Sequence, residues 1–363
     1  MLTGHGEEHI TQRILVPLMR KLSDNKKWWL MRQAAIRRHA ERIRSRKPSP
    51  RGVPSVRLPV GKDCCSMSKF GFDACSVLVA RMRSAAQNGA RRIVLDFTHL
   101  QSPLAATVLR LHAEAEYVCA FHPGTRITFV AAAQSNTEKL LKRSRFLRSA
   151  ETHQERPAGL LPITRCIGRP RLQDLFRKMN ESIYGGKVEI DDDEWQQVSG
   201  ALAEAVNNVQ DHAYDHEERE LYVKRLGARW WIYAETIRNE LWLAVYDKGI
   251  GIPEMVPRKR PSVLSLLRTA LPGQSRDALL LEAALLDSES RFSNLPHAGG
   301  HGKGLGRIQR LAKAHPNGRL FIASGNGLVQ ANNQGYHTHG LEHRVHGTLI
   351  QWNISILSSQ GAT

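Results

Sequence analysis

The chain has 363 residues, of which 41% are apolar, so it is long enough for two domains and apolar enough to bury a core in each, which excludes an intrinsically disordered protein. Lys and Arg number 52 against 34 Asp and Glu, a formal net charge of +18 that favours polyanionic partners. Five cysteines without paired spacing exclude a disulfide scaffold, and no apolar run approaches the roughly 20 residues of a membrane-spanning helix, so we expect a cytoplasmic protein without membrane insertion.

Residues 1–60 are predicted to form a basic helical arm and a linker. Basic residues dominate from position 13 to position 57, and prolines at 48, 50 and 54 follow the densest stretch. Two interpretations remain open: a solvated charged helix, or a contact with nucleic acid or another anionic partner. Nucleic acid is therefore a candidate partner of this arm.

Residues 61–150 are predicted to form a small α/β domain. Helical and strand patterns alternate along it, with a helix at 74–86, a strand at 91–97, a helix at 104–120, a strand at 126–132 and a helix at 136–147. Strands that alternate with helices in this way favour a parallel sheet.

The run VLDFTHLQSPLAATVLRLHAEAE (94–116) resembles the STAS fold of anti-sigma-factor antagonists, in which a strand ending in Asp leads through a short loop to a helix. In signalling members of that family a Ser at the start of the helix is phosphorylated. Here the loop is shorter and Ser102 is followed by Pro103, so no phosphorylation site is transferred from the resemblance. Ser102 also suits the simple role of an N-cap before a helix that begins with proline.

A connecting segment is predicted over residues 151–190. Positions 151–171 contain proline and show no regular period, so we expect an irregular stretch there, and positions 172–184 have a helical pattern. The chain changes character at GGKVEIDDDEW, and a second domain is predicted over 191–357, followed by a tail at 358–363.

One long amphipathic helix is predicted from 191 to 213. It begins with three Asp residues, which a helix N-terminus favours, and its apolar residues recur every three or four positions. Glu204, Asn208 and His212 lie four residues apart, so on an α-helix their side chains align on successive turns. Such a ridge is ordinary on a solvent-facing helix, and the segments that follow make it a candidate site.

Two glycine-rich segments follow this helix. The apolar strand LWLAVY (241–246) leads into DKGIGI (247–252), where a carboxylate at the end of a buried strand can accept a hydrogen bond from an exocyclic amine and glycines allow close approach. GHGKGLG (300–306) precedes a helical stretch at 305–314, an arrangement that suits phosphate oxygens held by backbone N–H groups. It matches neither the P-loop nor the dinucleotide-binding fingerprint.

Together and in this order, EAVNNVQDHA (204–213), DKGIGI and GHGKGLG resemble the N, G1 and G2 boxes of the GHKL superfamily. This superfamily includes gyrase B, the heat-shock-90 chaperones, sensor histidine kinases and anti-sigma kinases. The final strand GTLIQWNISI supplies the family's terminal Gly-Thr at Gly347 and Thr348. The resemblance implies an α/β two-domain protein whose C-terminal half is a sandwich, with a mixed, largely antiparallel sheet covered by helices on one face.

The same resemblance implies a Mg-ATP site. It implies that Glu204 orients or deprotonates the attacking group and that Asn208 coordinates Mg²⁺. It also implies that Asp247 pairs with the adenine amine and is supported there by Thr348. An amide oxygen is a suitable ligand for Mg²⁺, and a carboxylate can accept a proton from water or a hydroxyl. The other nucleotide-binding positions that it implies lie in the two glycine-rich boxes: Gly249, Gly251, Ile252, Gly300, Gly302, Lys303, Gly304, Leu305 and Gly306.

Residues 257–298 occupy the position of the ATP lid in this family. They contain two helical patterns, VLSLLRTAL and DALLLEAALL, and begin with the basic run PRKRP (257–261), which we expect to be flexible. Arg307, just after the G2 box, suits either a phosphate contact or a solvated helix charge.

Three functions remain open from the sequence. The first is an ATP-binding regulatory protein that hydrolyses ATP or transfers its γ-phosphate, as an ATPase or a Ser/Thr protein kinase, and whose nucleotide state controls a regulatory protein partner. The second is a nucleic-acid-binding protein gated by ATP, and the third is a catalytically silent nucleotide-binding scaffold. No phosphoacceptor His precedes the N box in a paired-helix domain, which argues against a sensor histidine kinase. An oligomer is compatible with all three.

Overall fold

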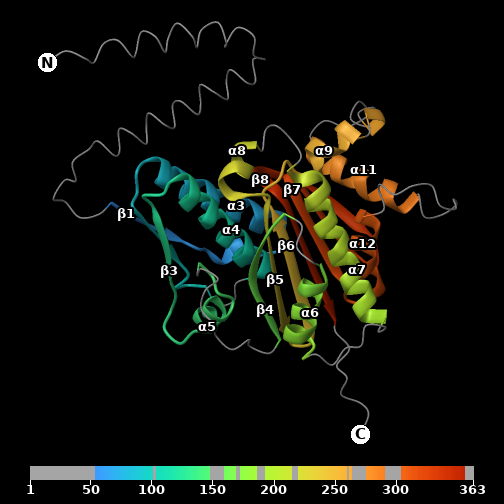
Figure 1. Ribbon diagram of the computed structural model, residues 1–363, viewed down its shortest axis with the longest axis horizontal. Coiled ribbons are helices and arrows are strands. Elements are labelled where there is room, and N and C mark those ends of the chain that lie inside the picture. Colours follow the sequence, from blue (N-terminus) through green and yellow to red (C-terminus); the bar gives the residue numbers. More distant parts are fainter. Residues whose placement is uncertain are drawn as a thin grey trace, which may run out of the picture. The chain divides into compact units, whose positions relative to one another are not determined.

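A computed structural model describes residues 54–100, 104–147, 159–168, 172–185, 193–214, 220–259, 261–263, 275–290 and 304–355. The chain divides after Val53, and all of these residues belong to the unit Pro54–Thr363. They form a mixed α/β fold with two sheets (Figure 1). Most of the predicted basic arm, the tail at 358–363 and Ser102 lie outside the described residues. Within the described part of the chain, no helix has the length and apolar character needed to cross a membrane.

The first sheet is parallel, with the strand order β1-β2-β3, as the alternating pattern predicts. Its strands and helices are β1 (Ser55–Pro59), α3 (Lys69–Gln87), β2 (Arg92–Asp96), α4 (Ala105–Phe121), β3 (Arg126–Val130) and α5 (Asn136–Arg143), with a 3₁₀ turn at Lys62–Cys65. Residues 55–59 were predicted to be linker, and that prediction is wrong. The segment pairs with β2 along its whole length, and the side chain of Leu58 is buried.

The second sheet is antiparallel, with the strand order β4-β5-β6-β8-β7. Its strands are β4 (Leu160–Ile167), β5 (Arg229–Ile237), β6 (Glu240–Asp247), β7 (Arg319–Asn332) and β8 (Tyr336–Ser355). Between β5 and β6, Arg238 and Asn239 both have positive φ, as a tight two-residue hairpin loop requires. The predicted final strand is thus the second half of the much longer β8.

Strand β4 lies within the stretch that was predicted to be irregular, so that prediction is wrong. Its register against β5 shifts between Leu161 and Thr164, around Pro162. Proline has no N–H to donate and is tolerated at an edge or a bulge, and β4 is an edge strand. The proline therefore marks an irregular edge strand and not the absence of one.

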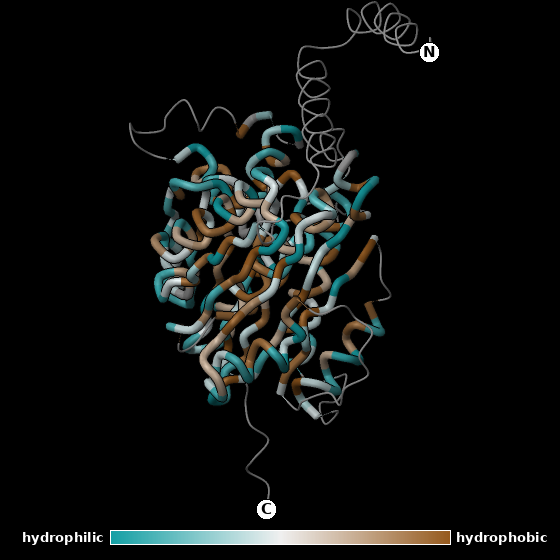
Figure 2. Tube along the Cα trace, turned by 90° about the vertical axis from the view of Figure 1, so that its left-hand side faces the viewer, coloured by the Kyte–Doolittle hydropathy of each residue, from teal (hydrophilic) through white to brown (hydrophobic). Residues whose placement is uncertain are grey.

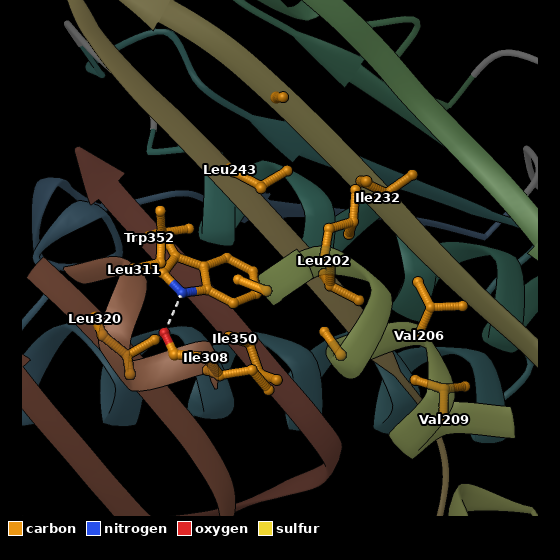
Figure 3. Close-up of a cluster of buried hydrophobic side chains, with 14 of the residues drawn as sticks. Leu202, Val206, Val209, Ile232, Leu243, Ile308, Leu311, Leu320, Ile350 and Trp352 are labelled. Atoms are coloured by element: carbon orange, nitrogen blue, oxygen red, sulfur yellow. Dashed lines mark hydrogen bonds between the residues drawn. The ribbon is translucent and has the colours of Figure 1, made fainter. Parts of the chain in front are cut away.

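Helices from the C-terminal half cover one face of this sheet. They are α6 (Leu172–Ile183), α7 (Asp193–Asn208), α11 (Arg276–Ser290) and α12 (Gly304–Ala314), and two further helices, α8 (Glu220–Leu226) and α9 (Ile252–Lys259), connect other elements. Figure 3 shows Leu202 of α7 and Leu311 of α12 packed toward Leu243 and Trp352 of the sheet. The Trp352 indole N–H donates to the carbonyl oxygen of Ile308 at 2.8 Å, which satisfies its polar atom within the core.

The opposite face of the five-stranded sheet is also covered, which corrects the expectation of helices on one face only. Leu109 of α4 and Phe72 of α3 share a buried cluster with Trp231, Tyr233 and Tyr246 of the sheet. Successive residues of the central strands are apolar on both faces, and a strand of that kind must be buried on both sides. In Figure 2 the hydrophobic residues, drawn in brown, run along these strands.

Candidate functional site

The predicted polar ridge begins on α7, where Glu204 and Asn208 lie one helical turn apart. The α-helix ends at Asn208, and Val209–Ala213 form a π-helical turn. The prediction of one α-helix through 213 is therefore wrong in its last turn. Because a π turn holds more residues than an α turn, His212 does not continue the four-residue alignment.

The π turn joins the end of EAVNNVQDHA (204–213), the predicted N box, to the glycine loop of DKGIGI (247–252), the predicted G1 box. The N–H of Ile250 donates to the carbonyl oxygen of Ala213 at 2.9 Å, and the N–H of Lys248 donates to the hydroxyl of Tyr214 at 2.8 Å. A Cβ on Gly249 would lie 2.4 Å from the Ala213 oxygen. Two segments more than thirty residues apart in sequence are thus in direct main-chain contact.

The glycines of this loop allow close approach, as the sequence predicts, and the groups that approach are those of the protein. At Gly249 the neighbour is Ala213. Gly251 has a φ of +89°, and a Cβ there would lie 2.7 Å from the Ser324 hydroxyl oxygen. Both glycines are therefore required by the packing of the loop itself.

Asp247 is the last residue of β6 and is only 4% exposed. Its Oδ1 accepts from the N–H of Gly249 at 2.7 Å. Tyr246 pairs with Leu349 across β6 and β8, so Asp247 and Thr348 are the next positions on neighbouring strands. Because side chains alternate and Tyr246 and Leu349 face α4, Asp247 and Thr348 are directed to the α7 face. The structure thus brings these two predicted residues together.

Ser324 of β7 connects the loop to β8, and sequence reasoning missed it. Its hydroxyl accepts from the N–H of Ile252 at 3.0 Å, donates to the carbonyl oxygen of Gly347 at 2.8 Å and lies 3.2 Å from Thr348 Oγ1. The only sequence signal is a lone hydroxyl in the apolar strand RLFIASGNG, just before two glycines. Ile252, the last residue of the G1 box, begins α9.

The G2 box is described only in part. Gly300, Gly302 and Lys303 lie outside the described residues, whereas Gly304 and Gly306 belong to the first turn of α12 and not to a loop. Leu305 packs against the core of the sheet.

Helix α12 lies beside α7 (Figure 1). Nη1 of Arg307 lies 3.0 Å from Glu204 Oε1, with the Arg307 side chain 53% exposed and that of Glu204 19% exposed. An ion pair so open to water adds little stability. Its significance is geometric, because it places the predicted catalytic carboxylate at the start of α12.

The predicted lid region is helical where it is described. The start of the basic run PRKRP belongs to α9, and Pro261–Val263 form a 3₁₀ turn. DALLLEAALL lies in α11, which is fixed on β7 because Asp277 Oδ2 accepts from the N–H of Asn326 at 2.7 Å. Most of VLSLLRTAL lies outside the described residues.

Lys248, inside the G1 box, is a further residue whose placement sequence reasoning missed. It is 2% exposed, and its Nζ lies 2.5 Å from Oε1 of Glu114 on α4. The only signal in the sequence is alternation, since a residue next to Asp247 must face the other side of the sheet.

The donor atoms fit a magnesium ion that arrives with phosphate groups. Mg²⁺ in nucleotide sites usually takes one or two protein oxygens and completes its shell with phosphate and water. Asn208, half-buried at the end of α7, offers one such oxygen. Among the described residues, no group of three or more His, Cys, Asp or Glu is placed to hold a metal without a ligand's help.

No family model matches the chain, and no curated protein matches it significantly.

Proposed function

We propose that the face of the five-stranded sheet next to α7 and α12 binds Mg-ATP in the manner of a GHKL domain. The observation that carries this proposal is the convergence of segments from four parts of the sequence. Ala213 contacts Ile250, Glu204 contacts Arg307, and Asp247 lies beside Thr348. A ridge or a glycine loop alone is common, but the contacts among these four segments support an adenine pocket next to a phosphate site.

Each residue then has a role that its chemistry supports. The buried carboxylate of Asp247, with Thr348 beside it, accepts a hydrogen bond from the adenine amine. Asn208 contributes an oxygen to Mg²⁺, which when bound neutralises charge on the phosphate oxygens. The N-terminus of α12, with Gly304 and Gly306, favours negative charge. Glu204 orients or deprotonates the water or hydroxyl that attacks the γ-phosphate.

The proposal covers the domains and the biological role as well. It assigns the antiparallel sheet with its helices to a GHKL domain over 191–357, extended by β4 and α6, and the parallel sheet to a STAS-like domain. Nucleotide state then controls the binding of a regulatory protein partner. ATP hydrolysis and transfer to Ser or Thr share the same first step, and separate measurement of free phosphate and labelled protein distinguishes them.

Replacing Asp247 by Asn tests the adenine site. The amide keeps an acceptor for the Gly249 N–H but loses the charge, and hydrogen bonds to charged groups contribute about 1.5–3 kcal/mol, so ATP affinity should fall by about 10- to 100-fold. Calorimetric titration with Mg-ATP measures it. Inorganic triphosphate, which lacks adenine, should bind both proteins equally.

The matched control for that variant is Glu240→Gln, at the other end of β6. It should bind ATP like the wild type. Equal ATP affinity in the wild type and Asp247→Asn would remove the adenine assignment, and a wild-type protein that binds no ATP would remove the proposal as a whole.

Polyanion binding is the second candidate function, and an exposed arginine cluster favours it. Arg92 and Arg126 are directly opposite each other on β2 and β3, where like charges destabilise a sheet, and Arg91 is adjacent. Among the described residues none of the three has an acidic partner. The Pro54 carbonyl accepts from the N–H groups of Arg91 and Arg92. Residues 1–53, which precede Pro54 in the sequence, carry 13 Lys and Arg against 4 Asp and Glu.

The double variant Arg92→Gln/Arg126→Gln should weaken duplex DNA binding and reduce its salt dependence. Each lost phosphate contact lowers the slope of log affinity against log salt by about 0.9. Fluorescence anisotropy at several salt concentrations measures both quantities, and deletion of residues 1–51 should reduce the slope further while ATP binding stays intact. Arg177→Gln on α6, where Asp174 and Glu181 compensate the charge, is the control. Unchanged DNA affinity in both altered proteins would show that these charges are only solvated.

A further inference from the structure

Lys248 and Asp247 are neighbours in the chain but lie on opposite faces of the sheet. Asp247 is directed to the α7 face, and the Lys248 side chain runs to the α4 face, where its Nζ lies 2.5 Å from Glu114 Oε1 and 4.8 Å from the centre of the Tyr117 ring. Lysine in a glycine-rich nucleotide loop is ordinarily expected at a phosphate. Here its charge is committed to α4 instead.

Glu114 is surrounded by donors. Arg83 Nε and Nη2 lie 3.1 and 2.5 Å from its Oε2, and the hydroxyl of Tyr246 lies 3.0 Å from its Oε1. The carboxylate is 1% exposed. Burial alone would raise the pKa of Glu114, but the charges of Arg83 and Lys248 outweigh it and hold that pKa well below its usual range. The two cations and the hydrogen bonds around Glu114 therefore favour its ionised form.

The main chain of Lys248 is held from the other side. Its N–H donates to the Tyr214 hydroxyl at 2.8 Å, and that hydroxyl in turn donates to the carbonyl oxygen of Arg229. Tyr214 follows the π turn of the N box directly. The loop is thus held between α7 on one face of the sheet and α4 on the other.

We propose that Glu114 is a positioning residue for the nucleotide site, which fixes the loop 247–251 through Lys248. This inference rests on the proposed ATP function. A neutral residue at 114 leaves two cations, Arg83 and Lys248, in a buried setting, and a buried charge without its partner is strongly unfavourable. Lys248 is the more deeply buried of the two and must move toward water, which displaces Asp247 and Gly249 next to it.

Three variants and one control, all in the full chain, test this proposal by Mg-ATP calorimetry. Glu114→Gln should weaken ATP binding at least about tenfold, because it expels Lys248. Lys248→Met should weaken it about threefold or more, because the loop loses its anchor while Glu114 keeps Arg83. In the double variant Glu114→Gln/Lys248→Met the affinity should equal that of Lys248→Met, since Glu114 acts only through Lys248.

Asp73→Asn is the control for a merely structural effect. Asp73 on α3 accepts from the N–H groups of Glu342 and His343 on β8, so it also ties the parallel-sheet part to the five-stranded sheet, but away from the loop. It should lower the melting temperature and leave ATP affinity unchanged.

The outcomes separate cleanly. If Glu114→Gln binds ATP with the same affinity as the wild type, Glu114 is not a positioning residue, but the proposed ATP site is unaffected. The same conclusion follows if the losses of ATP affinity in the two single variants add in the double variant. No binding by the wild type removes the ATP function itself. Where Glu114→Gln does not fold, Lys248→Met against Asp73→Asn decides, and equal affinities in those two variants overturn the inference.

Discussion

Replacing Glu204 by Gln is expected to leave Mg-ATP binding close to wild type while turnover falls at least about 100-fold. General acid–base groups typically contribute about 10²- to 10⁴-fold, and the amide cannot accept a proton. Gln retains the volume and an acceptor oxygen for Arg307, so the junction between α7 and α12 persists. Release of labelled phosphate and ATP calorimetry on the same preparation measure the two quantities.

Glu194→Gln is the matched control, because Glu194 lies on the same helix, ten residues or about 15 Å before Glu204. Its turnover should be unchanged. If the wild type consumes ATP and Glu204→Gln consumes it equally fast, the catalytic role is wrong and the ridge is helix surface beside a binding-only site. A wild type that binds ATP without consuming it identifies the silent scaffold.

Replacing Asn208 should affect ATP binding, unlike replacing Glu204, although both residues lie on α7. Asn208→Ala removes the proposed metal ligand, so the part of ATP affinity that depends on Mg²⁺ should fall, and turnover with it. Titration with and without EDTA measures this difference. An Mg²⁺ effect of the same size in Asn208→Ala and the wild type would remove Asn208 from the metal site.

The sequence predicted those features that depend on local pattern. The helix carrying Glu204, the strand before Asp247 and the parallel βα order all follow from the periodicity of apolar residues. The sequence could not predict β4, for two reasons. Pro162 argues against a strand, and the partner strand β5 lies far along the chain. The π turn at Val209–Ala213 is also in contact with a residue distant in the sequence, Ile250.

The contacts between distant segments were out of reach for the same reason. Ser324 and Thr348 meet only because β7 and β8 are paired. Glu114 and Lys248 are 134 residues apart, and each looks like a solvated charge when read alone. The register of a sheet and the docking of a helix on its second face are properties of the whole chain.

If the proposed ATP function holds, coverage of that second face limits how nucleotide state could be transmitted. Moving α4 away from the sheet would expose Trp231, Tyr233 and Tyr246, each a large buried side chain, at about 25 cal/mol per Å² of apolar surface. The Glu114–Lys248 pair would be broken as well. Transmission by small shifts of the loop and its anchors is therefore favoured over separation of the two parts.

Replacing Gly347 by Ala is expected to destabilise the protein by about 3 kcal/mol or more and to weaken ATP binding in whatever fraction remains folded. Gly347 has a φ of +95°, and a Cβ there would lie 2.0 Å from the Asp247 carbonyl oxygen and 2.8 Å from the Lys248 Cα. Backbone strain at such a φ costs about 1–3 kcal/mol, and the clash adds to it because both neighbours are main chain and cannot rotate away. β8 can then relax only by moving away from β6 at the position where Asp247 and Thr348 lie side by side.

Gly200→Ala provides the opposite result in the same protein. Gly200 lies within α7 and a Cβ there would meet nothing within 4 Å, so the alanine should stabilise by about 1 kcal/mol through its higher helix propensity. Urea unfolding of both variants gives the two free energies. The added methyl group clashes with the main chain at Gly347 and meets no atom at Gly200. The free energy of unfolding should therefore fall in Gly347→Ala and rise in Gly200→Ala. A Gly347→Ala protein as stable as the wild type would mean that β8 does not approach Asp247 this closely, and the placement of Thr348 beside the adenine site would fail with it.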